Sequence, residues 1–92
     1  MAVVHCKRSK YDVYIGRPSI WGNPFNIGKD GTRADVIKKY RAYLLNNGEL
    51  MDKVASLHGK TLGCWCSPKP CHGDVLQEIA YNQYIRLRIK TA

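Results

Sequence analysis

Alternating apolar and polar positions predict three short β-strands in this chain. Residues 2–6 (AVVHC) and 11–16 (YDVYIG) are β-prone runs separated by the basic, turn-like segment KRSK, and the pattern leaves open whether they pair with each other. Residues 60–66 (KTLGCWC) have breakers on either side and present alternate residues to two faces, with Leu62, Cys64 and Cys66 on one and Gly63 and Trp65 on the other. We expect this third run to be the central strand.

Apolar residues at helical spacing predict helices in the second half of the chain. Thr32 and Asp35 form a capping-box pattern, and the helix that follows should run to about Asn46 with an apolar face of Val36, Ile37, Tyr40, Tyr43 and Leu44. A shorter helix is predicted over 49–59, and another should open within 71–74. The helix that begins within 71–74 would direct four apolar residues toward the core: Val75, Leu76, Ile79 and Ala80.

The C-terminal segment 84–90 (YIRLRIK) shows a period of two, which predicts an edge strand with a cationic outer face. Continuation of the preceding helix is the competing interpretation. The patterns together predict one small α/β domain over residues 1–92. It would hold a sheet of three to four strands and two to three packed helices.

Length and charge narrow the classes of function. A chain of 92 residues has room for a single hydrophobic core. Its 15 Lys and Arg against 7 Asp and Glu give a net charge of +8, which favours an anionic partner such as a nucleotide or nucleic acid, although charge that serves only solubility explains it equally well. No apolar run approaches the roughly 20 residues of a membrane span, so we expect no membrane partner and a cytoplasmic protein with reduced thiols.

The segment 64–74 (CWCSPKPCHGD) concentrates metal-ligating residues. Zinc would take three sulfurs and one nitrogen from Cys64, Cys66, Cys71 and His72. These four lie within nine residues, whereas structural zinc sites usually draw on two separated pairs of ligands, so a member from elsewhere (His5, Cys6 or His58) would fit a zinc site better.

The same segment also suits a nucleophilic thiol. At a helix start the thiolate of Cys71 would be favoured by unpaired N–H groups, and His72 or Asp74 would be the candidate acid or base. The structural alternatives are that Cys64 packs in the core and that Asp74 only caps the helix. Because ligands of α/β folds bind at the carboxyl ends of strands, we expect Cys66, Cys71 and His72 to face a ligand.

A stiff glycine- and proline-rich loop, IGRPSIWGNPF, is the second concentration of unusual residues. Arg17 suits a phosphate, Trp21 or Phe25 a stacked base, and Asn23 a base edge or ribose. Arg33, near a predicted helix N-terminus, would add a phosphate contact. The alternative is that both aromatic rings fill the core. We expect loops 16–28 and 66–74 to converge on one pocket.

The segments DVYIGRPSIWGNPFNIG, GTRADVIKKYRAYL and GKTLGCWCSPKPCHGDVL resemble a family of small bacterial and phage proteins known as a domain of unknown function. The resemblance covers most of residues 11–76 and implies a phage source but no activity. The N-terminal HCKR and the basic C-terminal tail lie outside it. The positions that match the family's signature are Arg17, Asn23, Pro24, Phe25, Arg33, Cys64, Trp65, Cys66, Cys71, His72 and Asp74.

The functional hypothesis is a small protein, acting in the host cytoplasm if phage-encoded, that binds a nucleotide-type anion and sequesters a nucleotide immune signal. One alternative is an enzyme that acts on a nucleotide or nucleoside through Cys71 and His72. Another is a zinc-stabilised nucleic-acid-binding protein. A homo-oligomer would help so small a chain to build a deep site.

Overall fold

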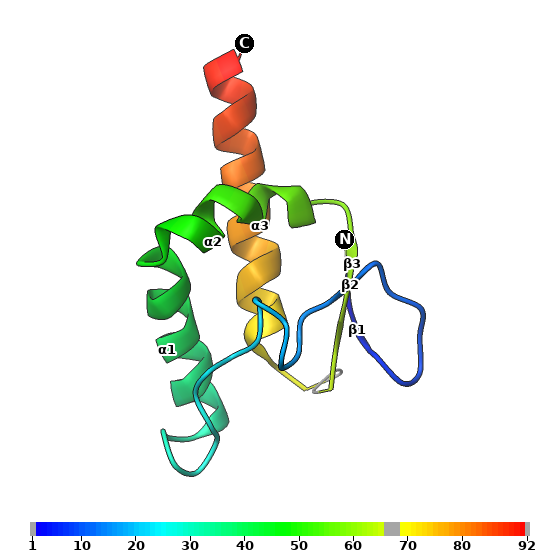
Figure 1. Cartoon of the computed structure of the whole chain (residues 1–92), viewed down its shortest axis with the longest axis vertical. Coiled ribbons are helices and arrows are strands. Elements are labelled where there is room, and N and C mark those ends of the chain that lie inside the picture. Colours follow the sequence, from blue (N-terminus) through cyan, green and yellow to red (C-terminus); the bar gives the residue numbers. More distant parts are fainter. Residues whose placement is uncertain (1, 66–68, 92) are drawn as a thin grey trace.

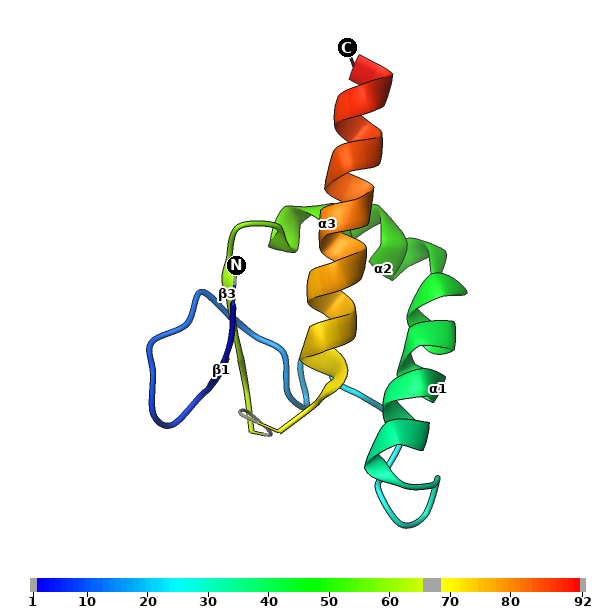
Figure 2. The ribbon, with the colours of Figure 1, turned by 180° about the vertical axis from the view of Figure 1, so that it is seen from behind.

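The computed structural model describes residues 2–65 and 69–91, and in this part of the chain three parallel strands form one sheet (Figure 1). The strand order is β1 (Ala2–His5), β3 (Thr61–Cys64), β2 (Val13–Tyr14). The helices lie on one side of the sheet from either viewing direction (Figures 1 and 2). The prediction of a small α/β fold is therefore confirmed.

The strand predicted to be central does hold the sheet together. Leu62 of β3 lies opposite Val3 of β1 on one side and Val13 of β2 on the other. The two N-terminal strands thus flank β3 instead of pairing with each other. On the helical side, Leu62 and Cys64 are buried in the core.

The loop between β1 and β2 passes on the side of the sheet away from the helices (Figure 1). Tyr11, at the end of this loop, lies so close to Gly63 that a Cβ atom at position 63 would come within 2.6 Å of its ring. Gly63 is therefore required for the loop to cross the central strand at this distance.

Three helical segments follow the long loop in the described residues: α1 (Arg33–Leu45), α2 (Gly48–Lys53) with the 3-10 turn η1 (Val54–Leu57), and α3 (His72–Thr91). The predicted capping box is present, since Thr32 Oγ1 accepts from the Asp35 N–H and the Asp35 carboxylate accepts from the Thr32 N–H. The bond from the Thr32 backbone lowers the pKa of Asp35. The predicted apolar face of α1 is also confirmed in that Val36, Tyr40 and Leu44 are buried.

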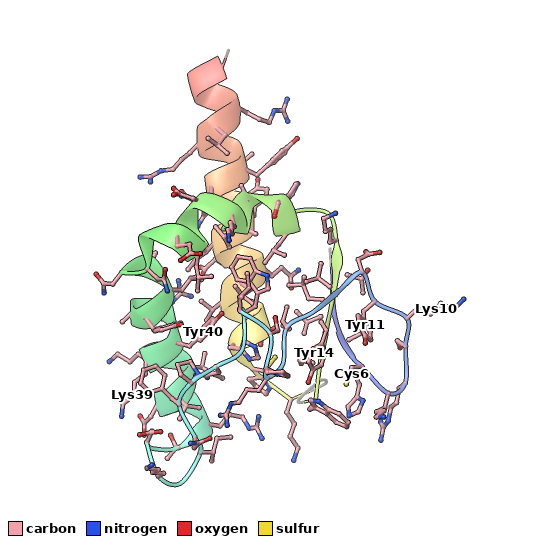
Figure 3. The ribbon with its side chains drawn as sticks, in the orientation of Figure 1. Cys6, Lys10, Tyr11, Tyr14, Lys39 and Tyr40 are labelled. Carbon is pink, nitrogen blue, oxygen red and sulfur yellow. The ribbon has the colours of Figure 1, made fainter. Side chains whose placement is uncertain are left out.

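Tyr40 connects α1 to the long loop and to α3 (Figure 3). Its hydroxyl donates to the Trp21 carbonyl oxygen at 2.8 Å, and its ring meets the His72 imidazole edge-on at 5.0 Å between centroids. Burial raises the pKa of Tyr40, so this hydroxyl stays a donor at any ordinary pH. The backbone of the loop is thereby anchored in the core.

The prediction of a C-terminal edge strand is wrong, because the segment continues α3 to Thr91. No Gly or Pro interrupts residues 74–91, and many of these residues are good helix formers. Helical spacing also supplies contacts that a strand would not: Arg88 lies 5.6 Å from the ring of Tyr84, which packs on His58. The final turns of α3 extend beyond the rest of the molecule (Figures 1 and 2).

Among residues 2–65 and 69–91, no helical stretch combines the length and the apolar character that a transmembrane span requires.

Removal of the Tyr40 hydroxyl should destabilise the protein. In the Tyr40→Phe variant the Trp21 carbonyl loses its donor inside the core, and we expect the free energy of unfolding, measured by urea titration, to fall by about 1 to 2 kcal/mol. The control is Tyr43→Phe, which removes the hydroxyl of the neighbouring half-buried ring. It should lower the free energy of unfolding by less than half as much. Equal losses in the two variants would contradict the anchoring role of the Tyr40 hydroxyl.

Candidate ligand-binding pocket

A cavity of about 400 Å³ opens where the carboxyl end of the sheet meets the first turns of α1 and α3. Parallel strands place their carboxyl ends at one edge, and the chain leaves this edge through the long loop and through the turn into α3. Both segments that the sequence singled out therefore line one cavity. Its walls are formed by Tyr14, Gly16, Arg17, Asn23, Phe25, Asn26, Ile27, Arg33, Val36, Ile37, Cys64, Trp65, Pro70, Cys71 and His72.

Arg17 and Asn23 hold the loop in shape as well as lining the cavity. The Arg17 guanidinium donates to the carbonyl oxygens of Asn23, at 2.8 Å, and Phe25, at 3.2 Å. The Asn23 side chain accepts from the Phe25 N–H at 2.9 Å and donates to the Val36 carbonyl at 3.3 Å. Arg17 uses only part of its donor capacity in this way, whereas Asn23 is largely committed to the protein.

The two aromatic residues predicted for base stacking have different positions. Trp21 is only 5 % exposed, belongs to the core and does not line the cavity. Phe25 lines the cavity and meets the ring of Tyr43 edge-on. Of this pair, Phe25 is therefore the one available to a ligand.

Arg33 lines the cavity from the first turn of α1. Its guanidinium donates to the Pro70 carbonyl at 3.1 Å, which ties α1 to the turn that precedes α3. The planar fork is thus held in place with further N–H groups in reserve. This fits the predicted position of a cation near a helix N-terminus.

Trp65 and Tyr14 also line the cavity, although the sequence reasoning did not propose them as ligand-binding residues. The Trp65 indole N–H donates to the Tyr14 hydroxyl at 2.7 Å, and that hydroxyl donates to the Arg17 carbonyl at 3.1 Å (Tyr14 in Figure 3). The Lys7 amine lies 5.4 Å from the Trp65 ring. The sequence signal that could have identified Trp65 is its position directly after the predicted central strand, because residues at strand ends line such cavities.

The start of α3 explains Cys71 and Asp74. The Cys71 thiol sulfur accepts from the Gly73 N–H at 3.3 Å, and the Asp74 carboxylate accepts from the Cys71 N–H at 3.1 Å. Asp74 is exposed and lies outside the cavity wall, so its position is that of a helix cap. Cys71 and Cys64, by contrast, contribute to the wall.

His72 is nearly buried and is held by a specific hydrogen bond. Its Nε2 lies 2.7 Å from the Ile15 carbonyl oxygen, so this nitrogen carries the proton and donates it. Burial is the main cause that lowers the pKa of His72, and the nearby Arg17 charge acts in the same direction. A neutral imidazole with its Nε2–H engaged is a structural element of the wall.

The zinc hypothesis stays a prediction. In the described parts of the chain, no three His, Cys, Asp or Glu side chains are arranged to hold a metal ion. Cys66, a member of the predicted ligand set, lies outside the described residues. Of the replacement ligands, His5 contacts Trp65, the Cys6 N–H bonds to the Cys64 carbonyl, and His58 packs on Tyr84 away from the cavity wall.

Comparison with known proteins places this chain among viral sequences of unknown activity. A family model described as "Domain of unknown function (DUF4326)" matches residues 4–82. The chain is 39% identical over 82 residues to an uncharacterized 12.4 kDa protein in the nrdA-td intergenic region of Enterobacteria phage T4, covering 84% of this chain and 74% of the relative.

A second relative is the uncharacterized protein R718 of Acanthamoeba polyphaga mimivirus, which is 34% identical over 101 residues. That similarity covers 84% of this chain and 77% of the mimivirus protein. No solved structure matches the chain.

The lowered pKa of His72 predicts a loss of stability in mild acid. The pKa of His72 is lower in the folded protein than in the unfolded chain, where it is near 6.5. The contribution of neutral His72 to the free energy of unfolding is therefore fully present above about pH 6.5 and is lost as the pH falls through the folded-state pKa. Between about pH 7.5 and 5.5, wild type should therefore lose more free energy of unfolding than the His72→Gln variant, which keeps an amide donor.

Urea titrations at the two pH values measure this difference. The matched control is His5→Gln, which removes an imidazole outside the core cluster and should leave the wild-type pH dependence in place. A His72→Gln protein with the same acid sensitivity as wild type would contradict the assignment.

Proposed function

Because this chain belongs to the DUF4326 family, whose description names no activity, we propose its function from the geometry of the pocket: it binds a nucleotide-type anionic ligand. The ligand lies between loop 16–28 and the turn into α3. The single observation that supports this proposal is the convergence of two arginines and several aromatic rings on one cavity of about 400 Å³. A cavity of that volume falls in the usual range for small-molecule sites.

The phosphate of the ligand interacts with the cationic part of the wall. Arg17 and Arg33 present guanidinium groups that the protein already orients through carbonyl contacts, which reduces the entropy lost on binding. Arg33 and His72, in the first turns of α1 and α3, also line the cavity, and the start of a helix favours negative charge. The net charge of +8 attracts an anion from a distance.

The base of the ligand interacts with the aromatic and aliphatic part of the wall. Phe25 and Trp65 offer ring faces or edges, and Val36 and Ile37 add apolar surface from α1. Trp65 is 54% exposed yet is oriented by its bond to Tyr14, as expected of a ring that stacks on a ligand.

Binding without turnover is favoured over catalysis by the state of the candidate acid and base groups. The His72 Nε2–H is used by the Ile15 carbonyl, and the Asp74 carboxylate is used by the Cys71 N–H. The Nε2–H of His72 is therefore not available as a proton donor, and Asp74 does not line the cavity. A small viral protein that holds a nucleotide unchanged would act by sequestration in the host cytoplasm, with a nucleotide immune signal as the ligand that best fits this role.

A nucleotide panel tests the proposal directly. Purified protein is titrated by calorimetry with mono-, di- and cyclic nucleotides and with a short single-stranded oligonucleotide, and each mixture is then analysed by mass spectrometry. We expect one nucleotide class to bind and to be recovered intact. Recovery of a chemically altered nucleotide would favour the enzyme hypothesis, and binding of the oligonucleotide alone would favour the nucleic-acid hypothesis.

Substitution of Arg33 locates the phosphate contact. For the nucleotide that binds, Arg33→Gln should weaken the affinity about tenfold or more, since a charged hydrogen-bond partner contributes about 1.5 to 3 kcal/mol. Lys38→Gln removes the same charge from an exposed position on α1 outside the cavity and should change the affinity less than twofold. Equal effects of the two substitutions would mean that only the overall charge matters.

A further inference from the structure

Two thiols meet in the wall of the cavity. The Sγ atoms of Cys64 and Cys71 lie 3.2 Å apart, within sulfur hydrogen-bond distance. Cys64 is the last residue of β3 and Cys71 immediately precedes α3, so the contact joins the end of the central strand to the start of the longest helix. The two residues are 1% and 3% exposed, yet both line the cavity.

The two sulfurs differ in their surroundings. Cys71 accepts the Gly73 N–H at the start of a 20-residue helix, and a helix N-terminus favours the thiolate over the thiol. Cys64 is the last residue of a strand and lies in the core. Cys71 is therefore the better nucleophile of the pair, and Cys64 is the neighbour placed to react with it.

We propose that Cys64 and Cys71 are a reversible oxidation site, at which a small hydroperoxide that enters the cavity converts the dithiol to a disulfide. The Cys71 thiolate attacks a peroxide oxygen, the O–O bond breaks, and hydroxide leaves as Cys71 becomes a sulfenic acid. The Cys64 sulfur then attacks the Cys71 sulfur, an S–S bond forms and the S–O bond breaks. The hydroxide that leaves in this second step takes the Cys64 proton, and the hydroxide from the first step takes the proton that Cys71 lost on becoming a thiolate. Hydrogen peroxide is thus reduced to two waters while two thiols are oxidised.

The disulfide requires little movement. A disulfide bond is about 2.0 Å long, so the sulfurs approach by roughly 1 Å from their present separation. The backbone beside Cys71 is already tightly packed, because a Cβ atom on Gly73 would come within 2.8 Å of Ile15 and 2.9 Å of Val3. This packing keeps α3 close to the sheet and thus keeps the two sulfurs in contact. The inference depends on this contact alone and is independent of the nucleotide proposal.

The experiment compares variants of the 92-residue protein that retain chosen cysteines. In a Cys6→Ser, Cys66→Ser protein, only Cys64 and Cys71 remain. Treatment with a few equivalents of hydrogen peroxide should produce a species lighter by two hydrogen atoms by intact mass spectrometry, and dithiothreitol should reverse the change. Addition of Cys64→Ser should instead leave Cys71 carrying an added oxygen that dimedone traps. Cys71→Ser should leave Cys64 oxidised at least tenfold more slowly.

Two further measurements keep the proposal falsifiable. The same protein unfolded in urea should form less of the disulfide and more of the oxygen-added products, because unfolding separates the sulfurs. In wild type, thiol alkylation followed by chymotryptic cleavage after Trp65 separates Cys64 from Cys66 and Cys71, so a bridge from Cys64 joins two peptides. Fragmentation of the joined peptides then shows whether Cys66 or Cys71 carries the alkyl group and which of the two is bridged. A bridge formed with Cys6 or Cys66, or a folded protein that gives only oxygen-added products, would overturn the proposal.

Discussion

The arrangement of this molecule depends on the parallel pairing of β3 with a strand on each side. Parallel pairing directs the carboxyl ends of β1, β2 and β3 to one edge of the sheet. Two of the segments that leave this edge, loop 16–28 after β2 and the turn after β3, lie side by side and line the cavity. Because Tyr40 and Arg33 tie that loop and that turn to α1, the cavity between them has walls drawn from distant parts of the chain.

Much of this fold could be predicted from local patterns. The capping box at Thr32 and Asp35 is a short-range hydrogen-bond arrangement, so four residues suffice to locate the start of α1. The central position of β3 followed from its apolar residues and its breakers. The C-terminal segment 84–90 alternates every two residues and so satisfies a strand pattern, but it is helical because no breaker interrupts the chain after α3 begins.

Side-chain roles at the site were less accessible to sequence reasoning than its location. A composition of Arg, Asn and aromatic residues indicates a polar pocket, but whether each donor faces a ligand or a carbonyl depends on loop geometry that no spacing rule supplies. Asn23 lines the cavity and also bonds to the backbone at Phe25 and Val36, whereas Trp21, one of the two rings expected to stack on a base, packs in the core. Trp65 was predicted to lie within the strand, on the face opposite Leu62 and Cys64. The strand ends at Cys64, and the Trp65 ring lines the cavity.

The crossing of Tyr11 over Gly63 determines how the face of the sheet away from the helices is covered. A parallel sheet is commonly shielded by helical layers on both of its faces. Here the β1–β2 loop, with the ring of Tyr11, covers the central strand where a second helical layer would otherwise lie. One face of the sheet is thus covered by few residues, and the helices lie against the other face, beside the cavity.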